Sequence, residues 1–234
     1  DALSWMIVGD KSKRNEIEEM FNMRADLGYV AEEILKNKKT HKIDPKIGTP
    51  IIMAKCERAT TAEEIWERNK GCAVEYKLDG LRIQCHITKD KIKLFSRGLE
   101  DMTAMFPDVV EGLKSQIEQG CIVEGEMIAV SPDGKTLAFN KTMNRKRKYD
   151  VDKMVEEIPM AIYLFEVLLI ENQSLIDESN SERWEKLKSL INLTPDPSPK
   201  LRRGESERGE VVRLMPRIIA KNSEDIQKMF DEAL

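Results

Sequence analysis

The chain has 234 residues, of which 41% are hydrophobic and 34% are charged, and its formal net charge is −4. This length suits one good-sized domain plus part of another, because domains typically run about 100 to 200 residues. The negative charge excludes a surface that is basic all over, and no apolar run of about 18 residues could span a bilayer, so we expect a protein outside the membrane whose nucleic-acid contacts, if any, are local.

The first 40 residues are predicted to be largely helical. The helical period runs through Ile17, Met20, Phe21, Leu27, Val30 and Ile34, with mostly three- and four-residue steps. The polar stretch that follows contains Pro45 and Pro50 and is interpreted as a linker. Residues 1–48 are too short to form a large core, so we interpret them as the tail of a domain that begins upstream.

Beyond the linker the pattern changes to that of strands. Residues 72–76 are strand-like, and Ile83, Cys85 and Ile87 alternate with polar residues as in a half-buried strand, which makes His86 a surface position. Lys89 and Asp90 are predicted to form a hairpin turn into the next strand.

The later elements complete an α+β fold. We expect a helix with Pro107 in its first turn, strands over 121–130 and 161–170, a helix over 181–191 with Ser181 as its N-cap, and a helix over 223–234. Three prolines and alternating charges predict a disordered insertion over 194–210. The fold class is thus a mixed or antiparallel sheet with helices packed around it.

Cysteine, histidine and basic residues restrict the chemistry further. Cys56, Cys72, Cys85 and Cys121 form no CxxC pair and lie in apolar or strand-like settings, which favours reduced core thiols in a cytoplasmic protein. The chain has only two histidines, which are too few for most histidine-based metal sites and make a histidine-based catalytic triad an unfavoured interpretation. The run from Arg145 to Lys148 is the best basic patch for nucleic acid, although a solvated turn is the more common meaning of such a run.

The segment from Glu75 to Arg82 carries the strongest chemical signal. It places Lys77 at the end of a strand, beside Asp79 and Arg82, with Gly80 expected to give the turn its backbone freedom. A lysine that attacks phosphorus must be neutral, and burial or nearby positive charge favours the neutral amine. The phosphoramidate that such an amine forms can later be broken by protonating its nitrogen, so a bound nucleotide stays transferable.

These residues resemble the KxDGxR motif of the nucleotidyltransferases that include DNA ligases, RNA ligases and capping enzymes. Further matches follow in the family's order: Ser96-Arg97 at a strand end, Glu124-Gly125-Glu126 in an apolar run, and Phe165-Glu166 in the last run. Longer stretches, among them residues 27–31, 106–110 and 145–151, resemble archaeal ATP-dependent DNA ligases in particular. The resemblance implies that residues 1–48 are the C-terminal helical part of a DNA-binding domain with its linker, and that residues 49–234 form an ATP-grasp-like adenylation domain.

The resemblance implies a role for each matching residue. Lys77 corresponds to the nucleophile that becomes AMP-lysine, Glu75 to the residue that recognises the adenine amine, and Phe165 to the aromatic that stacks on the base. Arg82 and Arg97 match arginines near the ribose and phosphates. Glu126 matches the acid near the ribose and the metal. ATP as AMP donor and Mg²⁺ are therefore the expected cofactors.

The function implied is that of an ATP-dependent DNA ligase, which seals nicks in double-stranded DNA during replication, repair and recombination. We expect a monomer, with a sliding clamp as a further partner of the full-length protein. Two alternatives remain open: an RNA ligase or GTP-using capping enzyme, and an inactive DNA-binding remnant. Competition between ATP and GTP, and between nicked DNA and nicked RNA, separates the first from a DNA ligase.

Two departures from the family pattern bear on activity. Glu166 stands where the family often has aspartate. The family's next motif, an EGxxxK-like strand, and the lysine-bearing strand after it would begin past Leu234, and the OB-fold domain and most of the DNA-binding domain are also missing. We therefore expect an incomplete adenylation domain, and little or no complete ligation by these residues alone.

Overall fold

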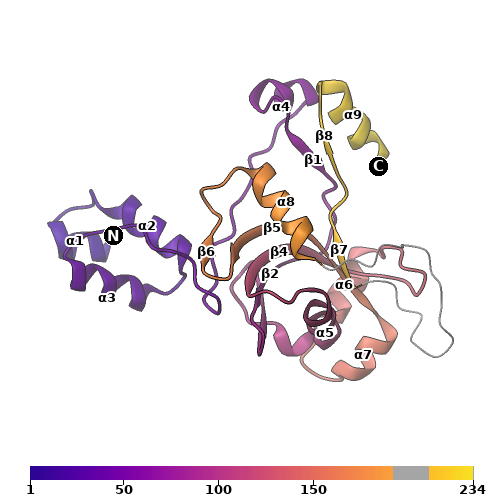
Figure 1. Cartoon of the computed structure of the whole chain (residues 1–234), viewed down its shortest axis with the longest axis horizontal. Helices are drawn as coiled ribbons and strands as arrows, with labels where there is room; N and C mark the ends of the chain where they lie inside the picture. The colour runs from indigo at the N-terminus through magenta and orange to yellow at the C-terminus, as the bar shows by residue number, and fades with distance from the viewer. Residues whose placement is uncertain (192–210, 234) are drawn as a thin grey trace.

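The computed structural model describes residues 1–191 and 211–233. Three helices open the chain: α1 (Ala2–Val8), α2 (Arg14–Met23) and α3 (Leu27–Asn37). They form a small bundle with its own apolar core, to which Met20, Val30 and Ile34 contribute, and the bundle lies to one side of the rest of the molecule (Figure 1). The helical prediction for this segment is confirmed, while its assignment to a DNA-binding domain stays a prediction.

A six-stranded sheet forms the centre of the molecule, in the order β3, β2, β4, β5, β6, with β7 also paired to β5. Its strands are β2 (Leu81–Ile87), β3 (Ile92–Ser96), β4 (Cys121–Ala129), β5 (Met160–Ile170), β6 (Gln173–Ser174) and β7 (Val212–Leu214). The β5–β7 pair is parallel, and the other pairs are antiparallel. A separate ribbon joins β1 (Ala73–Glu75) to β8 (Arg217–Ile219). The α+β fold with a mixed, largely antiparallel sheet is therefore confirmed.

Further helices lie around the six-stranded sheet and the β1–β8 ribbon (Figure 1). They are α4 (Ala62–Arg68), the 3-10 turn η1 (Thr103–Met105), α5 (Pro107–Gln116), α6 (Phe139–Arg145), α7 (Val151–Glu157), α8 (Asn180–Leu190) and α9 (Ser223–Glu232). Val109 and Leu113 of α5 and Leu187 of α8 are fully buried in the core on one face of the sheet. Pro107 occupies the first turn of α5 as predicted, because its missing N–H has no partner there in any case.

The prediction of a half-buried β2 is wrong. Gln84 and His86 are as buried as their apolar neighbours, with exposed fractions of 0% and 1%, because the chain at Ile47–Ile51 lies across the second face of the sheet. There the N–H of Gly48 donates to His86 Nδ1 at 2.9 Å, and Ile51 packs with Ile122 and Leu169. Burial lowers the pKa of His86 to about 4. The polar stretch that we interpreted as a linker is thus packed against the sheet.

Two smaller predictions also need correction. The N-cap of α8 is Ser179 rather than Ser181, and Ser179 forms a capping box with Glu182. Cys56 is exposed, whereas Cys85 and Cys121 are core thiols as predicted, with burial raising the pKa of Cys121 to about 12. The insertion predicted over 194–210 lies outside the described residues. Within the described ranges, no helix is long and apolar enough to cross a membrane.

The basic run at the end of α6 begins with a residue that cannot reach a ligand. Arg145 has an exposed fraction of 0%, and it donates from Nη2 to Asp108 Oδ1 at 2.7 Å. Lys146 pairs with Glu100 at 2.9 Å. The interpretation of this run as a nucleic-acid patch is therefore wrong for Arg145, which supports the core, while Arg147 and Lys148 remain exposed.

Candidate functional site

The turn that carries Lys77 joins two different sheets. It leaves β1 at Glu75 and enters β2 at Leu81, and within it Gly80 donates its N–H to Glu126 Oε1 of β4 at 3.1 Å. A Cβ at Gly80 would lie 2.4 Å from the carbonyl oxygen of Met127. Glycine is required here by close packing against β4 and not by a positive φ, which corrects the reason expected from the sequence.

Three predicted site residues gather at this end of the sheet. Glu126 is half-buried, and burial raises its pKa, while the charges of Lys77 and Arg82 oppose that rise. The Lys77 side chain is exposed on its turn, beside this carboxylate. Arg82 and Glu126 are cross-strand partners on β2 and β4. The geometry therefore brings the lysine, an arginine and an acid together.

Phe165 joins this group through Arg82. The guanidinium carbon of Arg82 lies 5.4 Å from the centre of the Phe165 ring, while Nη2 donates to Glu124 Oε2 at 2.5 Å and Nη1 to the carbonyl of Ala54 at 3.1 Å. Arg97 follows Ser96, which pairs with Ile83 in the β2–β3 register. That register places exposed Arg97 at the same sheet end as Arg82, although no contact joins it to the group.

Glu75 lies on the β1–β8 ribbon opposite Arg217, whose Nη1 is 3.9 Å from Glu75 Oε1. The Arg217 side chain is 5% exposed, its guanidinium carbon is 4.6 Å from the centre of the Trp184 ring, and Nη2 donates to Asn180 Oδ1 at 2.5 Å. Sequence reasoning missed Arg217, because it lies in no motif and only the pairing of distant strands brings it to Glu75.

Burial raises the pKa of Glu75; the charge of Arg217 opposes the rise, and that of Glu166 adds to it. Glu166 is itself paired with Arg183 of α8, through N–O distances of 2.8 and 2.9 Å. The longer acid at a position that often carries aspartate therefore reaches across to α8. Arg217 is the cation that favours the ionised form of Glu75, the form that could accept a hydrogen bond from an amine.

Replacing Arg217 with methionine is expected to raise the pKa of Glu75 further, because removing a nearby positive charge favours the neutral carboxyl. An acid whose pKa is raised in the folded state stabilises the fold below its unfolded pKa and loses that contribution as pH rises. The loss of folding stability in Arg217→Met should therefore be larger at pH 7 than at pH 4. Carbon-13 titration of the Glu75 carboxyl measures the shift. The matched control is Arg147→Met, and an unchanged Glu75 titration in Arg217→Met would contradict the prediction.

Replacing Gly80 with alanine should displace the lysine turn from β4. The new Cβ meets a backbone carbonyl, which cannot rotate away. We therefore expect transfer of AMP to Lys77, the role that the sequence resemblance implies for it, to slow about 100-fold, as a misplacement of about 1 Å can cause. Measured by urea unfolding, stability should fall by only about 1–3 kcal/mol. The control is Gly120→Ala, whose Cβ would make an ordinary 3.5 Å contact with Glu171. Transfer at the wild-type rate in Gly80→Ala would show that the turn tolerates displacement.

The described residues contain no cluster of three or more His, Cys, Asp or Glu side chains that could hold a metal ion. Glu126, the predicted metal ligand, is a single half-buried carboxylate with one oxygen already accepting from Gly80. Mg²⁺ commonly binds through one or two carboxylates together with waters and substrate phosphates. The residues present fit a magnesium ion shared with a nucleotide and do not form a complete cage of their own.

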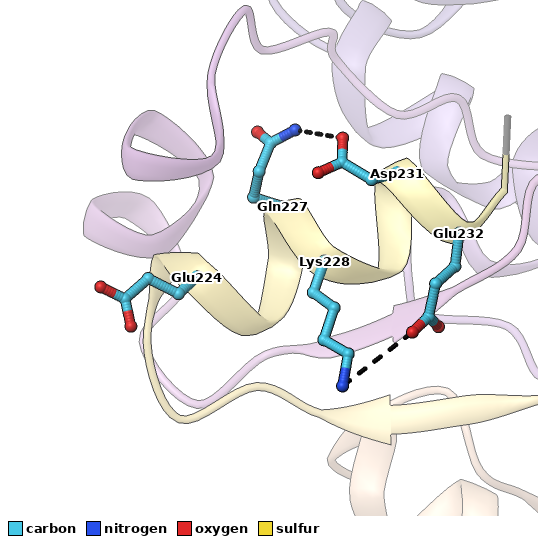
Figure 2. A pocket seen from close by; sticks show the side chains of 5 residues that line it. All are labelled: Glu224, Gln227, Lys228, Asp231 and Glu232. Carbon is cyan, nitrogen blue, oxygen red and sulfur yellow. Dashed lines mark hydrogen bonds and ion pairs between the residues drawn. The ribbon is translucent and has the colours of Figure 1, made fainter.

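A separate hollow lies along α9 (Figure 2). Its lining side chains all come from that helix: Glu224, Gln227, Lys228, Asp231 and Glu232. They engage one another, with Gln227 Nε2 donating to Asp231 at 2.8 Å and Lys228 lying 4.0 Å from Glu232. A hollow bounded by one surface helix encloses no ligand, and none of the predicted site residues lines it.

The antiparallel sheet and the lysine turn have the arrangement expected for the class of nucleotidyltransferases that the sequence motif resembles. A family model described as "ATP dependent DNA ligase domain" matches residues 53–234. The chain belongs to the ATP-dependent DNA ligase family.

Individual relatives agree with this family. A "Probable DNA ligase" of Dictyoglomus turgidum is 37% identical over 238 residues, covering 100% of this chain and 38% of that protein. A "DNA ligase" of Aeropyrum pernix is 38% identical over 200 residues, covering 83% of this chain and 33% of the relative. The solved "mycobacterial DNA ligase D complexed with ATP and MES" is 18% identical with a TM-score of 0.43, covering 68% of this chain and 44% of that one. The chain thus spans about a third of the length of these curated relatives.

Proposed function

We propose that the protein is an enzyme that seals nicks in double-stranded DNA through a covalent lysine-AMP intermediate, with ATP as the AMP donor. The observation that supports it most is the Lys77 turn, which is fastened to Glu126 through the N–H of Gly80 and is followed by Arg82, whose guanidinium lies over the Phe165 ring. Arginine, acid and aromatic side chains are the groups that phosphate, ribose and base require.

The first step is the attack of the neutral Lys77 amine on the α-phosphorus of ATP. An N–P bond forms, the bond from that phosphorus to the pyrophosphate oxygen breaks, pyrophosphate leaves, and the amine proton passes to solvent. AMP then moves to the 5′-phosphate of the nick, and the 3′-hydroxyl displaces it to join the strand. Most of the rate acceleration is expected from positioning and from stabilising charge on the phosphates.

We propose for the remaining residues the roles that the family resemblance implies. Glu75 accepts a hydrogen bond from the adenine amine, Phe165 stacks on the base, and Arg82 and Arg97 contact the ribose and phosphates. Glu126 binds the ribose and shares Mg²⁺, which when bound would offset triphosphate charge. We further propose a cytoplasmic monomer that acts in DNA replication, repair and recombination, and engages a sliding clamp.

The test incubates the protein with ATP labelled at its α-phosphate, magnesium and a nicked duplex. For these residues alone we expect label on the protein with little or no sealed strand, whereas the full-length protein should pass the label to the 5′-phosphate of the nick and then seal the strand. Competing GTP or nicked RNA should have little effect. Efficient use of GTP or RNA would favour a capping enzyme or an RNA ligase, and a protein that takes no label under any condition would favour a non-catalytic remnant.

A further inference from the structure

A continuous chain of hydrogen bonds crosses the second face of the sheet and ends at Arg82. It begins where the N–H of Gly48 donates to His86 Nδ1 at 2.9 Å, so that His86 Nε2 carries the proton and donates to Gln84 Oε1 at 2.8 Å. Gln84 Nε2 donates to Glu124 Oε1 at 2.7 Å. Glu124 Oε2 then accepts from Arg82 at 2.5 Å.

The chain segment from Ile47 to Ala54 is fastened to this network at three points. Besides the bond from Gly48, Ile51 exchanges two hydrogen bonds with the Gln84 amide, at 2.8 Å from its N–H and 3.2 Å to its carbonyl. Ala54 accepts from Arg82 Nη1 at 3.1 Å. This docked segment therefore contacts both the buried end of the network and the arginine at its other end.

Because the network is buried, a shift at one of its residues is passed on to the next. Gln84 is 0% and Glu124 3% exposed, so water cannot easily replace a lost partner. Both Gln84 amide hydrogens are donated, to Ile51 and to Glu124, and each Glu124 oxygen has one donor. A shift of Ile51 therefore alters the partners of Gln84, then those of Glu124, and finally the place of the Arg82 guanidinium over Phe165.

From this geometry we infer that Gln84 and Glu124 are positioning residues that couple the docking of Ile47–Ala54 to the placement of Arg82 for nucleotide binding. The inference rests on the proposed function, in which Arg82 contacts the ribose and phosphates. Neither residue touches the nucleotide. They act through Arg82. A segment that undocks from the sheet takes the Ala54 carbonyl away from Arg82 and removes the Ile51 partners of Gln84, which holds Glu124.

Coupling of this kind is reciprocal. If the docked segment raises the affinity for ATP, then ATP must raise the stability of the docked segment by the same factor, typically about 5- to 150-fold. A network that merely satisfies buried polar groups would not respond to ATP. The two views therefore differ in a measurement on the unaltered protein.

The test follows hydrogen exchange of the Gly48 and Ile51 amides by NMR, with and without saturating ATP and magnesium. Their protons are the ones donated to His86 and Gln84. We expect ATP to slow both exchange rates by at least about 5-fold. ATP that binds without slowing them overturns the inference and leaves the proposed function standing, whereas a protein that binds no ATP overturns both.

A variant supplies the second arm. Gln84→Met keeps the length of the side chain but removes its hydrogen bonds. We expect its dissociation constant for ATP to rise by the same factor by which ATP slows amide exchange in the wild type. ATP should then no longer slow the exchange of the Ile51 amide. Gln227→Met on exposed α9 is the matched control. Thermal unfolding verifies that each variant is folded, and Glu124→Gln replaces Gln84→Met if the latter is not. A folded variant of either residue that binds ATP as tightly as wild type overturns the inference.

Discussion

The Lys77→Arg variant is expected to take up no detectable AMP from ATP. A guanidinium stays charged at any accessible pH and has no free electron pair for attack on phosphorus, so the nucleophile is lost. The positive charge beside Glu126 is kept, so the electrostatics that oppose the rise of that acid's pKa change little. The measurement is transfer of label from the α-phosphate of ATP to protein, resolved on a denaturing gel.

The matched control is Lys114→Arg, an exposed lysine on α5 away from the turn. It should label like the wild type. Thermal unfolding should show both variants folded, since each exchanges one exposed cation for another. Label that persists in Lys77→Arg at the wild-type level would mean that another residue accepts AMP, and the role proposed for Lys77 would have to be abandoned.

The elements that could be predicted best from the sequence are strands that are largely buried along their whole length. The run that became β4 is buried at nearly every position and the run that became β5 has no exposed position, so their apolar residues alone indicate a strand. β2 shows the limit of this reasoning. Its alternating pattern predicts one face exposed to solvent, but the segment around Ile51 covers that face and supplies hydrogen-bond partners to Gln84 and His86. Periodicity reports on an element itself and not on what later packs against it.

The site divides in the same way. Lys77, Arg82 and Glu126 could be predicted because they lie in short motifs, and the structure brings them to one end of the sheet. Arg217 could not, because its meeting with Glu75 depends on the pairing of β1 with β8, more than a hundred residues along the chain. The need for glycine at position 80 was foreseen, yet its cause is the carbonyl of Met127, which local sequence does not reveal.

Replacing Arg145 with methionine is expected to lower the free energy of unfolding by about 3–5 kcal/mol, the usual cost of removing one partner of a buried ion pair. Arg145 is 0% exposed. It donates to Asp108 at 2.7 Å and to the carbonyl of Met105 at 2.5 Å, and its guanidinium lies 5.1 Å from the Phe106 ring. Methionine fills much of the volume but leaves the Asp108 carboxylate buried without its cation. Urea unfolding measures the loss.

The pH dependence of this loss identifies its cause. Burial already raises the pKa of Asp108 above its usual value, and Arg145 opposes that rise, so the variant should raise it further. An acid whose folded-state pKa is raised stabilises the fold below its unfolded pKa and loses that contribution as pH rises. The deficit of Arg145→Met should therefore shrink at acidic pH, where Asp108 is protonated.

Two further variants distinguish an unpaired charge from poor packing. Arg147→Met, at the exposed neighbour two residues on, should change stability by no more than about 0.5 kcal/mol. The double variant Arg145→Met with Asp108→Asn should recover part of the lost stability, because it removes the carboxylate that the single substitution leaves buried without a cation. If the double variant is no more stable than Arg145→Met, and its deficit does not vary with pH, then the stacking on Phe106 and not the ion pair holds α6 to η1 and α5.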